Sequence, residues 1–309
     1  MRAAIIDERN GTPKMVDIPE PEAVPGTLKI AVSAAGLGPT DIMRSAGTYK
    51  TPKVPYIIGG EGTGRSPDGG RVYFGHSIES SGAFGDWTIV PEEEVWPIPD
   101  DIDDGQAIAL AITGTGALIP LEEAKIKPGE RVLILGATGP LGQIALQLSR
   151  AMGAGSVVAA ARTRSALDRL AERGIADGIV HLGQGDDVAA LKAGAGSGYD
   201  VVLDCVYGPP AEAAMKAMAP GGRMMSIGVG AGMTMTLSLR DLVMRSHHGV
   251  GTGHRPVAER RAAYERLLGY HREGKLDVEI LWFDLDHAPE AWAAQVASPG
   301  AKIVLRTRR

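Results

Sequence analysis

The sequence predicts an α/β protein of two domains, in which a β-rich domain is interrupted by a doubly wound parallel sheet. Residues 1–118 are punctuated by glycine and proline and contain only short apolar runs, which is typical of β-structure. From Arg131 onward, apolar strand-like runs alternate with amphipathic helical runs, and this alternation indicates parallel strands joined by right-handed crossovers. We expect the first domain to comprise residues 1–118 and 273–309, and the second residues 119–272.

The composition is that of an ordinary globular enzyme. The chain has 309 residues, of which 44% are hydrophobic and 22% are charged, so apolar residues are sufficient for two cores. Aromatic residues make up only 5% and the net charge is −5, which argues against a stacking surface and against a phosphate-backbone partner. We therefore expect no nucleic-acid partner. A single cysteine excludes an internal disulfide and a cysteine-built zinc site.

No targeting or membrane segment is expected. The N-terminal residues MRAAIIDERNGTP reach acidic side chains early and contain no apolar stretch of signal-peptide length. No window of the sequence approaches the roughly 18 apolar residues of a membrane helix. We therefore expect a cytoplasmic protein without a membrane partner.

The β-rich domain is expected to use short strands on both sides of the interruption. Before it, the apolar runs are Leu28–Val32, Arg71–Phe74 and Trp87–Val90. After it, Val278–Trp282 and Lys302–Leu305 again have the character of strands, and we expect them to return to the first domain.

The second domain is expected to repeat a strand–helix unit, with apolar strands buried on both faces by amphipathic helices. The predicted strands are Arg131–Leu135, Ser156–Ala161, Asp177–Leu182, Tyr199–Val206 and Gly222–Val229. The predicted helices are Pro140–Ala154, Ser165–Gly174, Asp186–Gly194, Pro210–Pro220 and Val257–Arg272.

A glycine-rich turn joins the first of these strands to its helix, and it reads Gly136-Ala137-Thr138-Gly139-Pro140-Leu141-Gly142. In this context the first glycine permits a tight turn, the second permits close approach of a diphosphate, and the third permits helix packing. Proline suits the first helical position, where free N–H groups and the helix dipole attract phosphate. The alternative is a turn that binds nothing. We predict dinucleotide binding by Gly136, Thr138, Gly139, Pro140, Leu141 and Gly142.

The end of the second strand predicts which nicotinamide dinucleotide binds. An acidic residue there would bind the ribose hydroxyls of NAD and repel a 2′-phosphate. The sequence instead reads Arg162-Thr163-Arg164-Ser165, with no carboxylate before Asp168. Guanidinium and hydroxyl groups suit a phosphate, so we predict that Arg162, Thr163 and Arg164 bind NADP(H). The alternative is that both arginines are simply solvated.

Several segments outside the glycine-rich turn carry a family resemblance. They are Gly38–Asp41, Gly47–Tyr49, Ile58–Gly64, Gly82–Phe84, Lys127–Glu130, Pro220–Arg223 and Gly300–Val304. Together they resemble the medium-chain dehydrogenase/reductase superfamily, and within it the zinc-free quinone oxidoreductase (zeta-crystallin-like) and enoyl reductase branch. The resemblance covers essentially the whole chain. It implies a GroES-like catalytic domain combined with a Rossmann nucleotide-binding domain.

The sequence departs from the zinc-dependent relatives at the positions of their metal ligands. Zinc alcohol dehydrogenases of the superfamily have a cysteine where Pro39 stands, a histidine where Gly60 stands, and a further ligand near Ala111-Ile112-Thr113. A catalytic zinc needs three protein ligands, so we expect no metal. Many quinone-oxidoreductase relatives also have an asparagine at Gly38 and a second tyrosine at Met43, so a less polar pocket is expected here.

Without a metal to polarise its substrate, the protein is expected to deliver hydride to an already activated acceptor, a quinone or an α,β-unsaturated carbonyl. The product enolate then needs a proton and a hydrogen-bond donor. The resemblance implies Tyr49 for this role, with packing in the core or a loop as the alternative, and His254 or water as other proton sources. Asp41 either orients groups in the pocket or caps a helix beginning at Ile42.

Further cofactor contacts are expected at the crossover between domains and at the carboxyl ends of later strands. Thr113 lies at the expected crossover, and the alternative is a small residue chosen for a tight helix start. The remaining predicted contacts follow the fifth strand and the strand after it, and they are Ser226, Gly228, Val229, Gly251 and Thr252.

The sequence therefore favours a zinc-independent, NADPH-dependent reductase of quinones or activated alkenes. Two alternatives stay open, namely a non-catalytic NADPH-binding sensor or structural protein, and a dedicated enoyl reductase acting on a biosynthetic intermediate. The resemblance also implies a homodimer that pairs through the last strand of the nucleotide-binding sheet, at about His247–Gly251.

Overall fold

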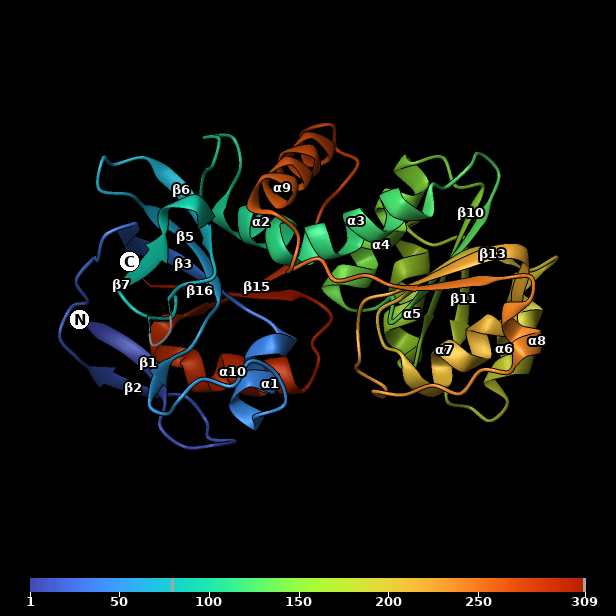
Figure 1. Ribbon diagram of the computed structural model, residues 1–309, viewed down its shortest axis with the longest axis horizontal. Coiled ribbons are helices and arrows are strands. Elements are labelled where there is room, and N and C mark those ends of the chain that lie inside the picture. The colour runs from blue at the N-terminus through green and yellow to red at the C-terminus, as the bar shows by residue number, and fades with distance from the viewer. Residues whose placement is uncertain (79–80, 308–309) are drawn as a thin grey trace. The chain divides into compact units, whose positions relative to one another are not determined.

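The computed structural model describes residues 1–78 and 81–307, and the chain divides into two compact units (Figure 1). Unit 1 comprises Met1–Ile112 and Val278–Arg309, and unit 2 comprises Thr113–Asp277. The two points at which the chain passes from one unit to the other lie a few residues from the domain boundaries expected from the sequence. At the first crossing the reason is that helix α3 (Gly114–Ala124) packs on α4 (Pro140–Ala151) and so belongs to unit 2.

Unit 2 is built on a parallel sheet with the strand order β11-β10-β9-β12-β13-β14. The order reverses between β9 and β12, and the carboxyl ends of these strands form the switch point at which doubly wound sheets bind ligands. The predicted doubly wound parallel sheet is thus confirmed. The strands are β9 (Arg131–Leu135), β10 (Ser156–Ala161), β11 (Gly178–His181), β12 (Tyr199–Asp204), β13 (Met218–Ser226) and β14 (Ser246–Gly249).

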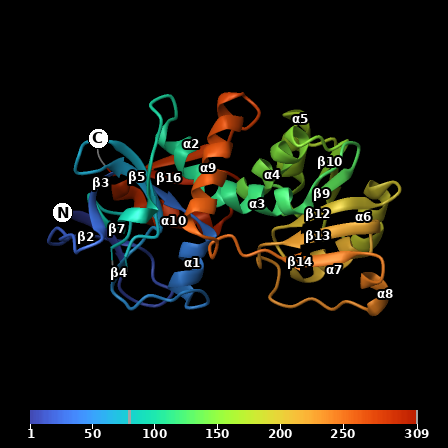
Figure 2. The same cartoon turned by 45° about the horizontal axis from the view of Figure 1, so that its top comes forward.

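Helices cover both faces of this sheet (Figure 2). Helices α3, α4 and α5 (Arg164–Glu172) lie on one face, and α9 (Val257–Arg272) packs on α3. Helices α6 (Asp187–Ala195) and α7 (Gly208–Met215) pack together on the other face, and the short α8 (Leu239–Leu242) precedes β14. Helix α9 has the bounds that the sequence predicts.

The core of unit 2 reflects the burial of its sheet on both faces. Alternate strand residues such as Leu133, Val158 and Val202 point toward α6 and α7 and form one apolar cluster with Leu191 and Ala211 of these helices. The intervening strand residues are also buried, which explains why each strand reads as a continuous apolar run.

Unit 1 contains a mixed sheet with the order β15-β16-β3-β5-β6-β8, in which β7 also pairs with β3, and a smaller sheet with the order β2-β1-β4. The strands before unit 2 are β1 (Arg2–Ile6), β2 (Lys14–Asp17), β3 (Thr27–Leu37), β4 (Tyr56–Ile57), β5 (Glu61–Arg65), β6 (Arg71–Gly75), β7 (Trp87–Pro91) and β8 (Val95–Pro97). The predicted return is confirmed, since β15 (Ile280–Asp284) and β16 (Lys302–Arg306) join this sheet and β16 pairs antiparallel with β3.

Helices α1 (Pro39–Ala46) and α10 (Ala288–Val296) pack in unit 1, and α2 (Asp104–Ile108) packs on β3 and β5 of the same unit. The apolar cluster of this unit combines residues from both sides of the interruption, including Ile30, Phe84, Trp292 and Ile303.

A buried ion pair crosses the mixed sheet. The Lys302 ammonium lies 2.7 Å from Glu61 Oε1, and the two side chains are only 5% and 7% exposed. The Tyr73 hydroxyl donates to the other carboxylate oxygen of Glu61 at 3.0 Å. Each oxygen of the buried carboxylate therefore has a partner, as a buried charge requires.

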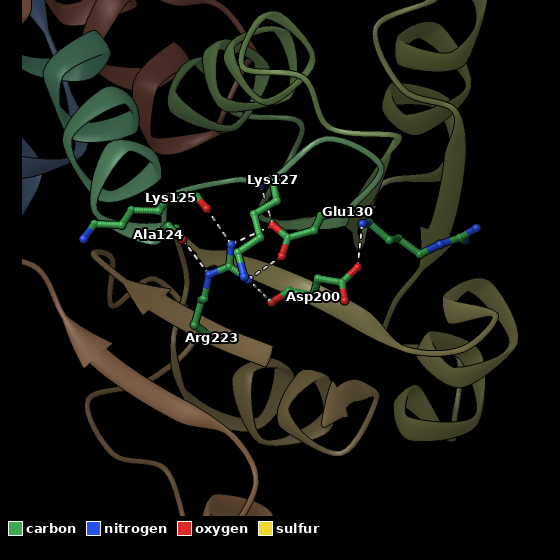
Figure 3. A network of polar contacts seen from close by, with 7 residues as sticks. Ala124, Lys125, Lys127, Glu130, Asp200 and Arg223 are labelled. Carbon is green, nitrogen blue, oxygen red and sulfur yellow. Dashed lines mark hydrogen bonds and ion pairs between the residues drawn. The ribbon is translucent and has the colours of Figure 1, made fainter. Parts of the chain in front are cut away.

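A second polar network fixes the amino-terminal edge of the sheet in unit 2 (Figure 3). The Arg223 guanidinium donates to both oxygens of Glu130 and to the carbonyl oxygens of Ala124 and Lys125. These bonds tie β13 to the end of α3 and to the start of β9.

The longest apolar helical run passes through α2 (Asp104–Ile108), a π-helical segment (Ala109–Thr113) and α3. Among the residues that the structure describes, this run of 21 residues meets the length and hydropathy of a membrane span, but 78% of its most apolar window is buried inside the protein. Such burial is typical of a core helix. The run is not evident from the sequence because glycine and threonine interrupt its apolar residues.

Candidate cofactor and active site

The turn between β9 and α4 has the backbone geometry expected of a diphosphate site. Gly136 has φ +74°, and its N–H and that of Ala137 donate to the Ala160 carbonyl at 3.0 and 3.2 Å. A Cβ at Gly142 would lie 2.5 Å from the Gly136 carbonyl oxygen, so only glycine permits this packing. At Gly139, by contrast, the nearest atom to such a Cβ would be 3.8 Å away, which leaves free space beside the turn.

Helix α4 begins at Pro140 and has no side-chain cap. Thr138 and Leu141 are half-buried beside it, and the Thr138 carbonyl accepts a hydrogen bond from Gln143 at 2.9 Å. The free space at Gly139 and the uncapped N–H groups fit the diphosphate of a dinucleotide, because an anion there satisfies both the orphan donors and the helix dipole. Binding by these residues stays a prediction.

The second predicted cluster lies at the exposed start of α5, directly after β10. Thr163 is the N-cap residue, but its side chain makes no capping hydrogen bond. Arg164 Nε donates to Asp168 at 2.8 Å, whereas the Arg162 guanidinium has no hydrogen-bond or ion-pair partner in the part of the chain that the structure describes. Of the two arginines, Arg162 is thus the one that is not already engaged.

A polar chain that the sequence analysis missed connects three adjacent strands. Asp204, fully buried at the end of β12, accepts from the Ser226 hydroxyl at 2.7 Å, and Ser226 Oγ lies 3.0 Å from His247 Nε2. Since the only hydroxyl hydrogen of Ser226 goes to Asp204, the bond to Ser226 is donated by His247 Nε2–H. Burial lowers the pKa of His247, with the Asp204 charge acting against it. The Ser226 hydroxyl, predicted to contact cofactor, is therefore held in an internal network.

The other predicted late contacts lie in the turns after β13 and β14. A Cβ at Gly228 would lie 1.9 Å from the Cys205 carbonyl oxygen, so the turn after β13 packs directly on the turn after β12. Val229 is 37% exposed, Gly251 is exposed and Thr252 is half-buried. His254 is exposed, and a Cβ at Gly251 would lie 3.5 Å from its ring.

Thr113 ends the π-helical segment that leads into α3, and it is half-buried without a capping bond. The alternative of a tight helix start is wrong, because the helix continues through this residue. π-Helical segments are rare and are frequent at functional sites, so the segment is a second reason to keep Thr113 as a predicted contact.

Asp41 lies in unit 1, where it is 7% exposed and its Oδ2 accepts from the Gly38 N–H at 3.0 Å. Helix α1 begins at Pro39 and not at Ile42, so Asp41 caps the helix from its first turn instead of preceding it. The expected start was wrong because proline is well suited to the first helical position, two residues before Asp41.

The Asp41 carboxyl also lines a small pocket with Arg44, Tyr56 and Gly60. Burial raises the pKa of Asp41 to about 6, although the Gly38 N–H, Lys302 and Arg44 favour the charged form. Among the described residues, the buried Tyr56 hydroxyl and Arg44 Nε have no hydrogen-bond partner. This pocket therefore combines polar groups with a carboxyl that takes up a proton close to neutral pH.

Tyr49 lies in the turn after α1 and is 38% exposed, with the Lys50 ammonium 5.6 Å from its ring centroid. Its position excludes the alternative of a core tyrosine, while a loop-packing role stays open. Tyr49 and Asp41 both belong to unit 1, whereas every predicted cofactor residue belongs to unit 2.

Within residues 1–78 and 81–307, no group of three or more His, Cys, Asp or Glu side chains is arranged to hold a metal ion. At the positions of the family's cysteine and histidine ligands stand Pro39 and Gly60. Gly60 faces the Arg44 guanidinium, since a Cβ there would lie 3.8 Å from Arg44 Nη1.

Comparison with known proteins supports one family. A family described as zinc-binding dehydrogenase matches residues 140–268. The chain is 26% identical to the quinone oxidoreductase-like protein 2 homolog of Nematostella vectensis, over 91% of this chain and 82% of that protein. It is 29% identical to the mitochondrial enoyl-[acyl-carrier-protein] reductase of Arabidopsis thaliana, over 93% and 83%. Polyketide synthases also match, and the chain spans 14% of one of them and 10% of another.

Solved structures agree with this assignment. The quinone oxidoreductase of Thermus thermophilus, solved alone and with NADPH, has a TM-score of 0.81 and 28% identity, over 99% of this chain and 100% of that one. The quinone oxidoreductase of Pseudomonas syringae pv. Tomato has a TM-score of 0.87 at 22% identity, with 99% of each chain covered, and shows the shared fold. The chain is an oxidoreductase of the medium-chain dehydrogenase/reductase superfamily and belongs to its quinone oxidoreductase-like branch.

Proposed function

We propose that the protein is a zinc-independent, NADPH-dependent reductase that delivers hydride to a quinone or an α,β-unsaturated carbonyl. The observation that carries the choice of cofactor is the start of α5. There the Arg162 guanidinium has no hydrogen-bond or ion-pair partner among the described residues, and the amino end of α5 has no side-chain cap. No carboxylate lies between the end of β10 and Asp168. A 2′-phosphate would satisfy both the guanidinium and the free N–H groups, whereas NAD would leave them without an anion.

The class of acceptor follows from the side chains that the protein offers. The described residues contain no cluster of metal ligands, so a carbonyl or alcohol would not be polarised by a protein-bound zinc. Quinones and conjugated carbonyls accept hydride without that help. The bound nicotinamide would supply the hydride. The relatives named above, a quinone oxidoreductase and an enoyl reductase, are consistent with both acceptors.

The protein's own groups then hold the dinucleotide and supply a proton. The amino end of α4 and Gly139 would bind the diphosphate, and Arg162 the 2′-phosphate. Tyr49, partly exposed and able to donate from its phenol, is the proposed proton source for the enolate oxygen or carbon, with His254 and water as the alternatives. Asp41 is proposed to take part as a buried carboxyl, since its pKa of about 6 lets it exchange a proton close to neutral pH.

We further propose that the protein forms a homodimer through the free edge of β14. This strand ends the sheet order, and the segment before it exposes Leu239, Val243 and Met244 by 78%, 68% and 59%. An unpaired strand edge beside exposed apolar side chains favours pairing with a second copy. We also expect the protein to act in the cytoplasm.

The test is a turnover assay with purified protein, NADPH or NADH, and a panel of quinones, enones and a crotonyl thioester, with and without a chelator. NADPH-selective, chelator-insensitive turnover is the expected result. Turnover restricted to the thioester would favour the dedicated enoyl reductase, which the Arabidopsis relative supports. Tight NADPH binding without any turnover would favour the non-catalytic alternative, and loss of turnover with chelator would contradict zinc independence.

A further inference from the structure

Tyr207 has a backbone conformation that is normally reserved for glycine. The residue follows β12 and precedes α7, with φ +60° and ψ −168°. For a side chain with a Cβ this region is strained, and residues held in it cluster at ligand-binding and catalytic sites. Such strain persists only where the surroundings dictate the conformation.

The surroundings of Tyr207 do so. Asp204 Oδ1 accepts from the N–H groups of Val206 and Tyr207 at 3.0 and 2.8 Å, and Asp204 is itself held by Ser226. The next residue is equally constrained, because a Cβ at Gly208 would lie 2.8 Å from the Ala231 carbonyl oxygen. The Tyr207 ring lies beside the His247 ring, with centroids 6.0 Å apart. The Asp204–Ser226–His247 chain thus fixes the backbone at Tyr207, and its histidine borders the tyrosine ring.

This position adjoins the glycine-rich turn. A Cβ at Gly136 would lie 2.8 Å from Val206 Cγ1, so the residue before Tyr207 packs on the first glycine of that turn. Tyr207 therefore stands at the carboxyl end of β12, beside the point where the strand order reverses. Its ring is half-buried, and its hydroxyl has no hydrogen-bond partner in the described part of the chain.

We propose that Tyr207 is a cofactor-contacting residue, whose strained backbone holds an aromatic ring against the dinucleotide beside the Gly136–Gly139 turn. The inference rests on the proposed function, because it requires a bound nicotinamide dinucleotide. A ligand contact explains why an aromatic residue is kept at this edge at the cost of backbone strain, because a turn with no ligand to contact would adopt this conformation without strain if glycine stood here.

The test compares Tyr207→Gly with Lys125→Gly. Lys125 is the matched control, because it also has positive φ (+51°) and is exposed, but it precedes β9 at the opposite edge of the same sheet. Both variants release strain, so neither is expected to lower Tm. For Tyr207→Gly the Kd for NADPH is expected to rise roughly 5- to 20-fold, as for one lost aromatic contact, while Lys125→Gly leaves the Kd unchanged.

A second measurement does not depend on the glycine variants. With ring-labelled tyrosine, the Tyr207 resonance, assigned from its absence in Tyr207→Phe, is expected to shift when NADPH is added. The proposal is overturned if the Kd of Tyr207→Gly for NADPH stays within about twofold of wild type, or if the Tyr207 resonance does not shift when NADPH is added. If wild type prefers NADH, the NADP assignment fails and the same comparison is made with NADH. If it binds neither nucleotide, both proposals fall.

Discussion

Arg223 and Glu130 form a two-bond ion pair in which Nη1 lies 2.8 Å from Oε1 and Nη2 lies 2.6 Å from Oε2 (Figure 3). The side chains are 18% and 14% exposed, so the pair is largely removed from solvent. The Arg223 hydrogen bonds, with a smaller contribution from the Lys127 N–H, lower the pKa of Glu130 in spite of its burial. The pair therefore links β13 to β9 by charge-assisted bonds, which are the strong class.

Glu130→Gln is expected to lower the free energy of unfolding by about 2–4 kcal/mol, because it leaves the guanidinium without its charge partner. Urea unfolding measures the change. The matched control is Glu265→Gln, which removes an exposed pair with Arg261 and is expected to change stability by less than about 0.5 kcal/mol. The lowered pKa of Glu130 also determines how the free energy of unfolding depends on pH. The stabilisation from this carboxylate is present above the ordinary glutamate pKa and is lost as pH falls through the lowered pKa. Equal losses of unfolding free energy in Glu130→Gln and Glu265→Gln would contradict the stabilising role of the Arg223–Glu130 pair.

Lys302→Met is expected to destabilise the protein by about 3–5 kcal/mol, because it leaves the buried Glu61 carboxylate without a counter-charge. The double variant Lys302→Met with Glu61→Gln is expected to recover most of that loss. The amide oxygen of glutamine still accepts from the Tyr73 hydroxyl, and no unpaired charge remains. A double-mutant cycle by urea unfolding measures the coupling. Additive losses would show that the pair contributes no coupling free energy.

Asp41→Asn is expected to alter how stability depends on pH. Burial raises the pKa of the folded-state carboxyl from 3.8 to about 6, so folding binds a proton. The contribution of this carboxyl is therefore full below pH 3.8 and is lost as pH rises through about 6. The asparagine variant keeps an acceptor for Gly38 and should become the more stable protein above that range, on the order of 2–3 kcal/mol. Parallel stability curves for the two proteins between pH 4 and 7 would refute this.

Arg162→Ala is expected to weaken NADPH binding by roughly 10- to 100-fold and to leave NADH binding nearly unchanged, because only NADPH carries the 2′-phosphate. Titration calorimetry with both nucleotides measures the effect. Arg164→Ala is the matched control, and a smaller loss is expected because Arg164 already binds Asp168. Equal weakening of both nucleotides by Arg162→Ala would rule out the phosphate role.

Val243→Glu is expected to dissociate the proposed homodimer, because it places a charge on the exposed apolar segment beside β14. Sedimentation velocity at micromolar concentration should show a dimer for wild type and a monomer for the variant. Val296→Glu in α10 is the control, since Val296 is 62% exposed in unit 1 and lies outside the proposed interface. A wild-type protein that sediments only as a monomer contradicts the proposal.

Local patterns in the sequence predict much of the fold. Helix α9 was predicted with its observed bounds, and the conformation of Gly136 and the packing of Gly142 follow from the strand–turn–helix pattern alone. The start of α1 was missed although Pro39 marks it. Proline at the first helical position is a signal that was present in the sequence.

The polar networks could not be predicted in the same way. Asp204, Ser226 and His247 meet only once the register of β12, β13 and β14 is known. Lys302 and Glu61 are 241 residues apart. The one available signal was Glu61 itself, because a carboxylate inside a glycine-rich strand must find a cation when it is buried. Sequence spacing gives no indication of which lysine provides it.

The division of unit 1 into two chain segments bears on the order of events at the ribosome. All of unit 2 is synthesised before β16 emerges, so the unit encoded in the middle of the chain can complete its sheet first. Until Lys302 is added, the strands around Glu61 lack both a neighbouring strand and a counter-charge. Strand β16 is thus the element that closes the half-built unit 1, and a ribosome that stalls before it would hold a chain with one finished unit and one open sheet.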